Sequence, residues 1–381
     1  MIPPRHRALW IGAVLLLLLP LLVLVATGYS ETGRYGMLSA ARVVLAELGW
    51  GAPSAEHEIL KLRLLRALCA VGVGGSLALA GGMTQGLFRN PLAEPGLLGV
   101  GSGAMLGAVV AIALLGGYGP EAWMRQQAGG SATWDRLLSF GLVPALAFLG
   151  ALSATLTIYR LATRRGRISV PGLLLTGLAI NALLGALMAT LQVLLLQDWQ
   201  ASRAILAWGF GTLDDRSLFH IVVVWLGALV ALLGMPFVAL ELDLLAGGEE
   251  DAAALGADPG RIKTLVLACV ALATAASVSV SGQIAFVGLL VPHVMRQIVG
   301  PHHRRLLPVA FLAGATLVLL VVVFQHGMCP LLAEWVAADS PKLALACRRV
   351  TGMQPGALTS LLGAPFFLYL LLKQERKIIE V

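Results

Sequence analysis

Long apolar stretches dominate the chain, and short polar segments separate them. About ten of these stretches approach the roughly 20 residues that a helix needs to cross a bilayer core of about 30 Å. They cover residues 8–28, 64–86, 96–117, 139–161, 172–196, 218–240, 264–281, 284–299, 306–325 and 355–372. We therefore predict an all-α, polytopic membrane protein of about ten transmembrane helices, with residues 1–381 forming a single transmembrane domain.

The composition agrees with this pattern. Only 12% of the residues are charged, 58% are hydrophobic and the mean hydropathy is +0.86, whereas soluble domains carry about 25% charged residues. Lys and Arg gather in short loops and in both tails, most clearly at Arg160, Arg164, Arg165 and Arg167. The positive-inside rule then predicts that both termini are cytoplasmic. No basic tract interleaves with aromatic residues, so no nucleic acid partner is expected.

The first apolar stretch allows two interpretations. A basic start at Arg5 and Arg7 is also typical of a secretory signal peptide. However, residues 8–28 exceed the usual apolar core of such a signal, which has about 7–15 residues. We expect an uncleaved first transmembrane helix.

The predicted spans lack the groups that most membrane chemistry requires. None contains Asp, Glu or Lys, whereas ion-coupled transporters keep an ionisable group within the membrane. His220 and His293 have no second metal ligand at a suitable spacing, so no bound metal is expected. The chain has no Gly-Lys dipeptide and hence no phosphate-binding P-loop. Any uphill transport must therefore draw its energy from a partner.

The cysteines divide into two groups. Cys69 and Cys269 lie in predicted spans, where a small packing residue is the simpler interpretation. Cys329 and Cys347 both fall in the loop 326–354, which the predicted topology places outside the cell. Two thiols in an oxidising compartment can pair. We predict a disulfide between Cys329 and Cys347.

Four polar islands interrupt the apolar pattern, and the first is RNPLAEP at residues 89–95. Pro91 and Pro95 remove backbone donors and disfavour helix immediately before them. Such a break at membrane depth must be buried in protein or line a cavity. An ordinary interfacial turn is the alternative.

The second island covers residues 247–263 and contains GGEEDAAALGADPGRIK. Three acids open a short predicted helix, where they complement the helix dipole, and Gly256 ends it. This helix is either a capped connector or a projection that docks in the groove of a partner. In the third island Gly282 and Gly288 flank a tight turn and Pro292 breaks the next helix. The fourth is the last span, which Gly363 and Pro365 interrupt.

Together, in this order, the islands resemble the FecCD-type permease family of binding-protein-dependent ABC importers for iron-siderophores, haem and cobalamin. The matching segments are Arg89-Asn90-Pro91-Leu92-Ala93, Gly248 through Ala252 to Leu255-Gly256, Gly282-Gln283-Ile284 through Pro292-His293, and Gly356 to Phe367. The resemblance covers roughly residues 60 to 372. It implies the architecture of a type II ABC importer permease.

The resemblance also implies roles for particular residues. The segment 247–256 corresponds to a coupling helix that contacts the ATPase, through Gly248, Glu249, Glu250, Asp251, Ala252, Leu255 and Gly256. Residues of the structural and pathway motifs are Arg89, Asn90, Pro91, Gly282, Pro292, His293, Gly363 and Pro365. Ile168, Ser169 and Val170 match a region where relatives narrow the pathway, although an interfacial turn explains them equally well.

The resemblance further implies that a substrate-binding protein docks at Arg63 and Arg66, whose i, i+3 spacing puts both on one helix face. The loop 326–354 departs from the family pattern, which leaves Arg348 or Arg349 as a replacement for a missing docking arginine.

The expected function is that of the membrane-spanning permease of an ATP-driven importer in the bacterial inner membrane, with a ferric siderophore as cargo. Haem, cobalamin and oxyanions are alternative cargoes, and an ion-coupled secondary transporter is the alternative from another class. The chain itself is not expected to be an enzyme or to bind a cofactor. Expected partners are a pair of ATP-binding cassette subunits that use ATP, a second permease copy or homologous permease, a periplasmic or lipoprotein substrate-binding protein, and membrane lipid.

Overall fold

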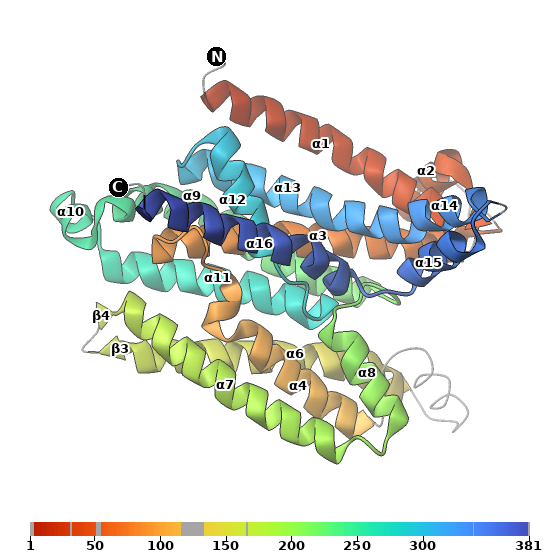
Figure 1. The fold of residues 1–381 in the computed structure, drawn as a ribbon, viewed down its shortest axis with the longest axis horizontal. Coiled ribbons are helices and arrows are strands. Elements are labelled where there is room, and N and C mark those ends of the chain that lie inside the picture. The colour runs from red at the N-terminus through yellow and green to blue at the C-terminus, as the bar shows by residue number, and fades with distance from the viewer. Residues whose placement is uncertain are drawn as a thin grey trace.

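The computed structural model describes residues 4–30, 33–50, 55–115, 133–164, 167–337 and 339–379. The long helices run side by side across Figure 1. The elements in chain order are α1 (Pro4–Gly28), β1 (Tyr29–Ser30), β2 (Gly33–Arg34), α2 (Gly36–Glu47), α3 (His57–Phe88), η1 (Pro95–Leu98), α4 (Val100–Leu115), α6 (Thr133–Ala162), β3 (Thr163–Arg164), β4 (Arg167–Ile168), α7 (Val170–Leu194), α8 (Trp199–Gly209), α9 (Leu218–Gly247), α10 (Glu249–Ala254), α11 (Pro259–Ser281), α12 (Val287–Val299), α13 (His303–Val323), η2 (Phe324–Met328), α14 (Cys329–Trp335), α15 (Pro341–Thr351) and α16 (Pro355–Ile379).

The all-α prediction is confirmed, and each predicted span coincides with helical structure. In the described part of the chain, 8 helices are long and apolar enough to cross a membrane, and α4 and α12 are shorter apolar helices. The third span divides into η1 and α4 because Gly99, with φ of 77°, separates them. The helices α9 and α11 extend beyond the predicted spans and so include Asp243 and Lys263. The strands form two short antiparallel hairpins, β1–β2 and β3–β4.

The centre of the bundle is α3, which packs against α13, α9, α11 and α12. The apolar windows of α3, α11 and α13 are mostly buried, whereas α1, α7 and α9 expose most of theirs. A second group, α4, α6, α7 and α8, lies in the lower half of Figure 1 and joins the first through α11. The long exposed faces are apolar, as expected for helices in contact with lipid or with another membrane subunit.

Glycines let the central helices approach each other closely. A Cβ atom on Gly74 would lie 2.3 Å from the carbonyl oxygen of Gly314, and a Cβ atom on Gly314 would lie 2.3 Å from that of Gly74. A Cβ atom on Gly81 would lie only 1.8 Å from the carbonyl oxygen of Gly288. Such contacts are typical of membrane helices, whose association depends on close packing rather than on the hydrophobic effect.

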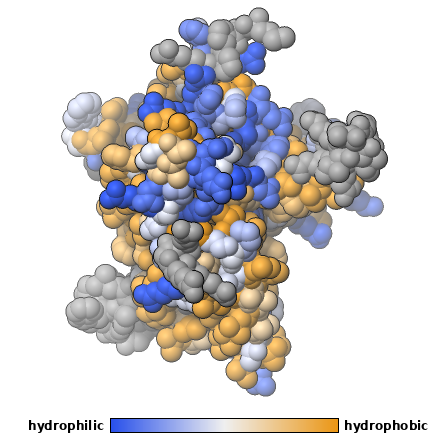
Figure 2. Space-filling model, turned by 90° about the vertical axis from the view of Figure 1, so that its left-hand side faces the viewer, coloured by the Kyte–Doolittle hydropathy of each residue, from blue (hydrophilic) through white to orange (hydrophobic). Residues whose placement is uncertain are grey.

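The two ends of the bundle differ. The start of α1, the end of α16, α10 and the β3–β4 hairpin lie at one end, and α2, α14 and α15 lie at the other (Figure 1). Hydrophilic residues gather on the end that carries α10, whereas apolar residues surround them (Figure 2). This end therefore resembles a surface that lies in water beyond the bilayer.

Candidate coupling surface and translocation motifs

The predicted coupling segment is a helix of 6 residues, Glu249–Ala254. Gly248, with φ of 135°, precedes it, and Gly256, with φ of 86°, follows it, so glycines form both turns. Ala252 is fully buried, whereas the side chain of Leu255 is 71% exposed. The helix thus rests on the bundle through a small residue and presents a large apolar side chain beside exposed acids.

The RNPLA segment forms a hydrogen-bonded corner at the end of α3. Arg89 adopts the left-handed conformation that ends the helix. The side chain of Asn90 accepts a hydrogen bond of 2.9 Å from the backbone N–H of Leu92. Pro91 and Pro95 flank the turn, and Pro95 is the first residue of η1.

Two neighbouring helices satisfy the backbone groups that follow this corner. The amide of Asn181 in α7 donates to the Gly96 carbonyl at 3.2 Å, and the hydroxyl of Thr155 in α6 donates to the Leu98 carbonyl at 3.1 Å. The break is therefore packed in protein, as its depth in the bundle requires.

The third and fourth islands meet in the structure although about 70 residues separate them in the sequence. Gly282 and Phe286 both have positive φ angles, 68° and 65°, and they shape the turn between α11 and α12. A Cβ atom on Gly356 would lie 2.3 Å from the carbonyl oxygen of Gln283, and one on Gly363 would lie 2.3 Å from the Cβ atom of Phe286. The two motifs therefore form one close backbone contact.

The remaining motif residues lie in α12 and α16. Pro292 and Pro365 are within helices, and Pro292 contacts α3 near Gly82. Nε2 of His293 lies 2.9 Å from Nε2 of Gln297, and its ring packs edge-on against Phe366. Among the described residues, no group of three metal-binding side chains exists.

A docking role for Arg63 stays a prediction, and the structure buries this residue. Its side chain is only 4% exposed, and its guanidinium group lies over the ring of Tyr35 and donates to the Thr27 carbonyl. The cause is α2, whose Val43 packs in one apolar cluster with Leu60 of α3. Helix α2 lies outside the apolar stretches and was not predicted.

Arg66 remains partly accessible, but it is paired. Its Nη2 atom lies 2.9 Å from Oδ1 of Asp214, in the loop between α8 and α9. A docking role for Arg66 stays a prediction, and it now requires a partner to compete with Asp214. On α15, Arg348 and Arg349 are exposed, and their role as a replacement for the docking arginine stays a prediction.

The outer segment 326–354 is more ordered than a loop. Its first residues complete the π-helical η2 and α14, and α15 follows. The amide of Gln325 donates to the carbonyls of Thr351 and Met353, and Arg34 of β2 pairs with Glu334 of α14. These contacts connect both ends of the segment to the bundle.

The predicted disulfide is absent from the structure. Cys329 and Cys347 are both free thiols, although α14 and α15 pack together. Cys329 is buried at the start of α14, whereas Cys347 lies on a partly exposed face of α15.

Three polar contacts between separate segments were not predicted from the sequence. Asp243 accepts hydrogen bonds from the backbone N–H and Nδ1 of His303, at 2.9 and 2.6 Å, and joins α9 to α13. Gln283 donates to the Gly101 carbonyl at 3.1 Å. Lys263 pairs with Glu249 of α10 at 2.6 Å. Each of these polar residues lies just outside a predicted span, and that position was the available signal.

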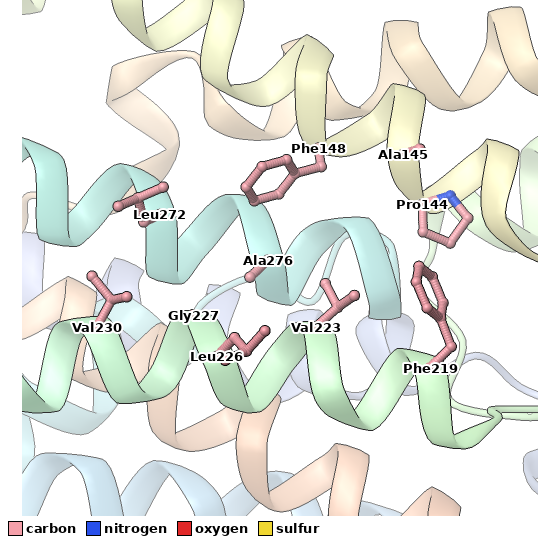
Figure 3. A pocket seen from close by; sticks show the side chains of 10 residues that line it. All are labelled: Pro144, Ala145, Phe148, Phe219, Val223, Leu226, Gly227, Val230, Leu272 and Ala276. Carbon is pink, nitrogen blue, oxygen red and sulfur yellow. The ribbon is translucent and has the colours of Figure 1, made fainter.

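One cavity of about 360 Å³ opens between α6, α9 and α11 (Figure 3). The side chains of Phe148, Phe219, Leu226 and Leu272 line it, and none of its lining residues is polar or charged. A hydrophilic chelate would find no hydrogen-bond partner there. The cavity therefore offers no cargo site.

Sequence and structure comparisons define the class of protein. A sequence model of the FecCD transport family matches residues 11–333. A cobalamin import system permease protein, BtuC, of Halobacterium salinarum is 39% identical over 87% of this chain and 78% of its own length. The hemin transport system permease protein HmuU of Yersinia pestis is 36% identical over 94% of this chain and 95% of its own.

A further relative and a solved structure point to the same class of protein. A probable iron chelatin transport system permease protein of Helicobacter pylori is 32% identical over 83% of this chain and 82% of its own. A solved structure of a metal-chelate type ABC transporter in an inward-facing conformation has a TM-score of 0.68 at 26% identity, covering 95% of this chain and 99% of that one.

A bundle of apolar helices interrupted by these motifs is the fold of a multi-pass permease of the inner membrane, of the kind that serves ABC importers. The chain belongs to the FecCD transport family. As a permease of the metal-chelate, haem or cobalamin type, it is a transport component and not an enzyme.

Proposed function

We propose that residues 1–381 form one permease domain of an ATP-driven importer, and that α10 contacts its ATP-binding subunit. The observation that carries the proposal is the exposed Leu255 beside Glu250 and Asp251, on a short helix at the hydrophilic end of the bundle. Apolar anchors surrounded by polar residues are typical of protein interfaces. The acids extend this surface toward a partner groove.

The end that carries α10 faces the cytoplasm in this proposal. The α6 helix ends there with Arg160, within the basic cluster that the positive-inside rule assigns to the cytoplasm. The start of α1 and the end of α16 lie at the same end, so both termini are cytoplasmic as well (Figure 1). The opposite end, with α15, then meets the substrate-binding protein through Arg348 and Arg349.

A second permease, either a copy of this chain or a homologue, completes the transport pathway. The helices α7 and α16 expose large apolar side chains, among them Leu175, Leu178 and Leu361. Symmetric pairing of such faces is the usual solution for a membrane subunit that forms half of a pathway. The motif residues Arg89, Asn90, Pro91, Gly282, Pro292, His293, Gly363 and Pro365 support that pathway from within the bundle.

The proposed cargo is a ferric siderophore. A wide path between two permeases can pass a large chelate without specific side-chain ligands, so the cargo is set largely by the binding protein. Similarity to the cobalamin import permease of Halobacterium salinarum favours cobalamin as the second candidate. Proteoliposomes offered a ferric hydroxamate siderophore, haemin or cyanocobalamin, each with its binding protein, distinguish these cargoes by the one that accumulates.

The decisive experiment tests the α10 contact directly. The full chain is purified from its native membrane in mild detergent, and retained proteins are identified by mass spectrometry. We expect a P-loop ATPase, which is lost when Leu255 is replaced by Asp. The matched control is Leu48→Asp at the end of α2, which adds the same charge to a similarly exposed Leu away from α10.

Retention of the ATPase by Leu255→Asp, with the chain still folded, contradicts the proposed role of α10. Energy coupling is tested separately in proteoliposomes. Uptake that depends on internal or external ATP and survives an uncoupler supports the importer. Uptake that persists without ATP and collapses with the uncoupler supports an ion-coupled secondary transporter instead.

A further inference from the structure

Lys263 is a buried charge at the start of α11. Its side chain is 4% exposed, although the neighbouring Arg261 and Thr264 are exposed. The ammonium group has two oxygen partners in the structure. Nζ lies 2.6 Å from Oε2 of Glu249 and donates to the backbone carbonyl of Ile168 at 2.9 Å. A buried ammonium group requires such partners, because removal from water is costly.

The two partners belong to different moving parts of the proposed machine. Glu249 is the first residue of α10. Ile168 is the last residue of β4, and it precedes Ser169, whose hydroxyl caps α7 by accepting from the N–H of Gly172. In Figure 1, the start of α11 lies between α10 and the β3–β4 hairpin. One side chain therefore joins the coupling segment to the beginning of α7.

The connections of α10 along the chain are pliable. Gly248 and Gly256 both occupy backbone conformations that are open mainly to glycine, and glycine turns resist rotation weakly. Rotation in these turns would therefore absorb a displacement of α10 unless a side-chain contact transmits it. Charge-assisted hydrogen bonds are short and strongly directional, and the Lys263 contacts supply that connection.

We infer that Lys263 is a positioning residue that transmits the displacement of α10 to the start of α7. The inference rests on the proposed function, because it takes α10 as the segment that the ATPase moves. The receiving helix suits the role, since most of the apolar length of α7 is exposed within this chain and the helix packs mainly against α4, α6 and η1. Movement at Ile168 shifts the first turn of α7, at residues 168–170, which match a region where relatives narrow the pathway.

A first experiment measures this connection in the chain alone. Amide hydrogen exchange is followed in lipid nanodiscs for residues 168–173 and 249–256. We expect Lys263→Met to accelerate exchange about tenfold in both segments, whereas the exposed neighbour variant Arg261→Met changes neither. Glu249→Gln should accelerate exchange in residues 168–173 too, and this effect should vanish when Lys263→Met is already present.

If Lys263→Met abolishes the effect of Glu249→Gln on residues 168–173, then Lys263 transmits displacement and is not only a local anchor. If Lys263 only anchors α11, Glu249→Gln alters α10 alone, and its effect adds to that of Lys263→Met. Unchanged exchange at residues 168–173 in Glu249→Gln overturns the inference. Glu249 is partly exposed, so this variant gives an answer even if Lys263→Met fails to fold.

A second experiment uses the assembled importer in proteoliposomes and measures ATP hydrolysed per chelate taken up. We expect Lys263→Met to retain the ATPase but to raise this ratio about tenfold, because α10 moves without α7. Lys263→Arg should restore most of the coupling, and Arg261→Met should match the unmodified chain.

A normal ratio in Lys263→Met, with accelerated exchange absent, overturns the role of Lys263 and leaves the proposed function intact. A chain that keeps its ATPase after Leu255→Asp overturns the proposed function instead. The two failures are thus distinguishable.

Discussion

Gly81 is the position at which a single methyl group should disturb the bundle most. A Cβ atom there would lie 1.8 Å from the carbonyl oxygen of Gly288, whereas an ordinary contact begins at 3.4 Å. The difference between these distances, about 1.6 Å, must open between α3 and α12 before Gly81→Ala can fold. Both sides of the contact are backbone, so no side-chain rotation can relieve it.

The loss of folding free energy expected for Gly81→Ala follows from this geometry. Overpacking a core costs about 1–3 kcal/mol, with the high values where the surroundings cannot rearrange. We therefore expect Gly81→Ala to lower the free energy of unfolding by about 3 kcal/mol, or roughly a hundredfold in the ratio of folded to unfolded protein. Gly82→Ala should cost less, because its Cβ atom would contact the flexible end of Leu307 at 2.8 Å.

The assay is a titration of the folded chain with sodium dodecyl sulfate in mixed micelles, followed by circular dichroism. The matched control is Gly185→Ala in the interior of α7, where no atom lies within 4 Å of the added carbon. Because Ala is a better helix former by up to about 1 kcal/mol, this control should be as stable as the unmodified chain or slightly more so. Equal stability of Gly81→Ala and Gly185→Ala would falsify the close contact of α3 with α12.

Three further predictions test the corner, the turn and the outer end. Burial raises the pKa of the Glu94 carboxyl, so the ionised carboxylate destabilises the folded state at pH values above that pKa. Glu94→Gln should therefore raise the thermal midpoint at neutral pH. This gain should disappear as the pH falls through the pKa of Glu94. Gly282→Ala, at φ of 68° and 2.2 Å from a backbone oxygen of α8, should cost at least about 3 kcal/mol, seen as loss of folded protein by size-exclusion chromatography. For Arg66→Ala and Asp214→Ala, a double-mutant cycle of unfolding free energies should give a coupling of about 1 kcal/mol; additive effects would show that the pair contributes nothing.

The spans were predictable because hydropathy depends on single positions. An apolar stretch such as 172–196 identifies α7 without knowledge of any neighbour. The signals for short helices at the surface were weaker but present. The α8 helix begins after Asp198, whose side chain accepts hydrogen bonds from Gln200 and Ala201, and this residue type commonly caps a helix.

The contacts between distant segments were not predictable from one sequence. Nothing in the sequence identified Gly314 or Gly288 as the residues against which the glycines of α3 pack. Arg63 was not predicted to be buried, for the same reason. Its spacing with Arg66 was correctly interpreted as one helix face, yet only the structure shows that α2 covers part of that face.

Differences in packing explain how the bundle can have a rigid core and still move. Backbone contacts of glycine bind α3 to α12 and α13, so these helices are expected to shift together. The long apolar face of α7 lies largely outside this core, and its first turn connects to α10 through Lys263. A force on α10 therefore meets a rigid core on one side and a weakly held helix on the other. Displacement follows the weaker constraint, which places the conformational change at α7 rather than at α3.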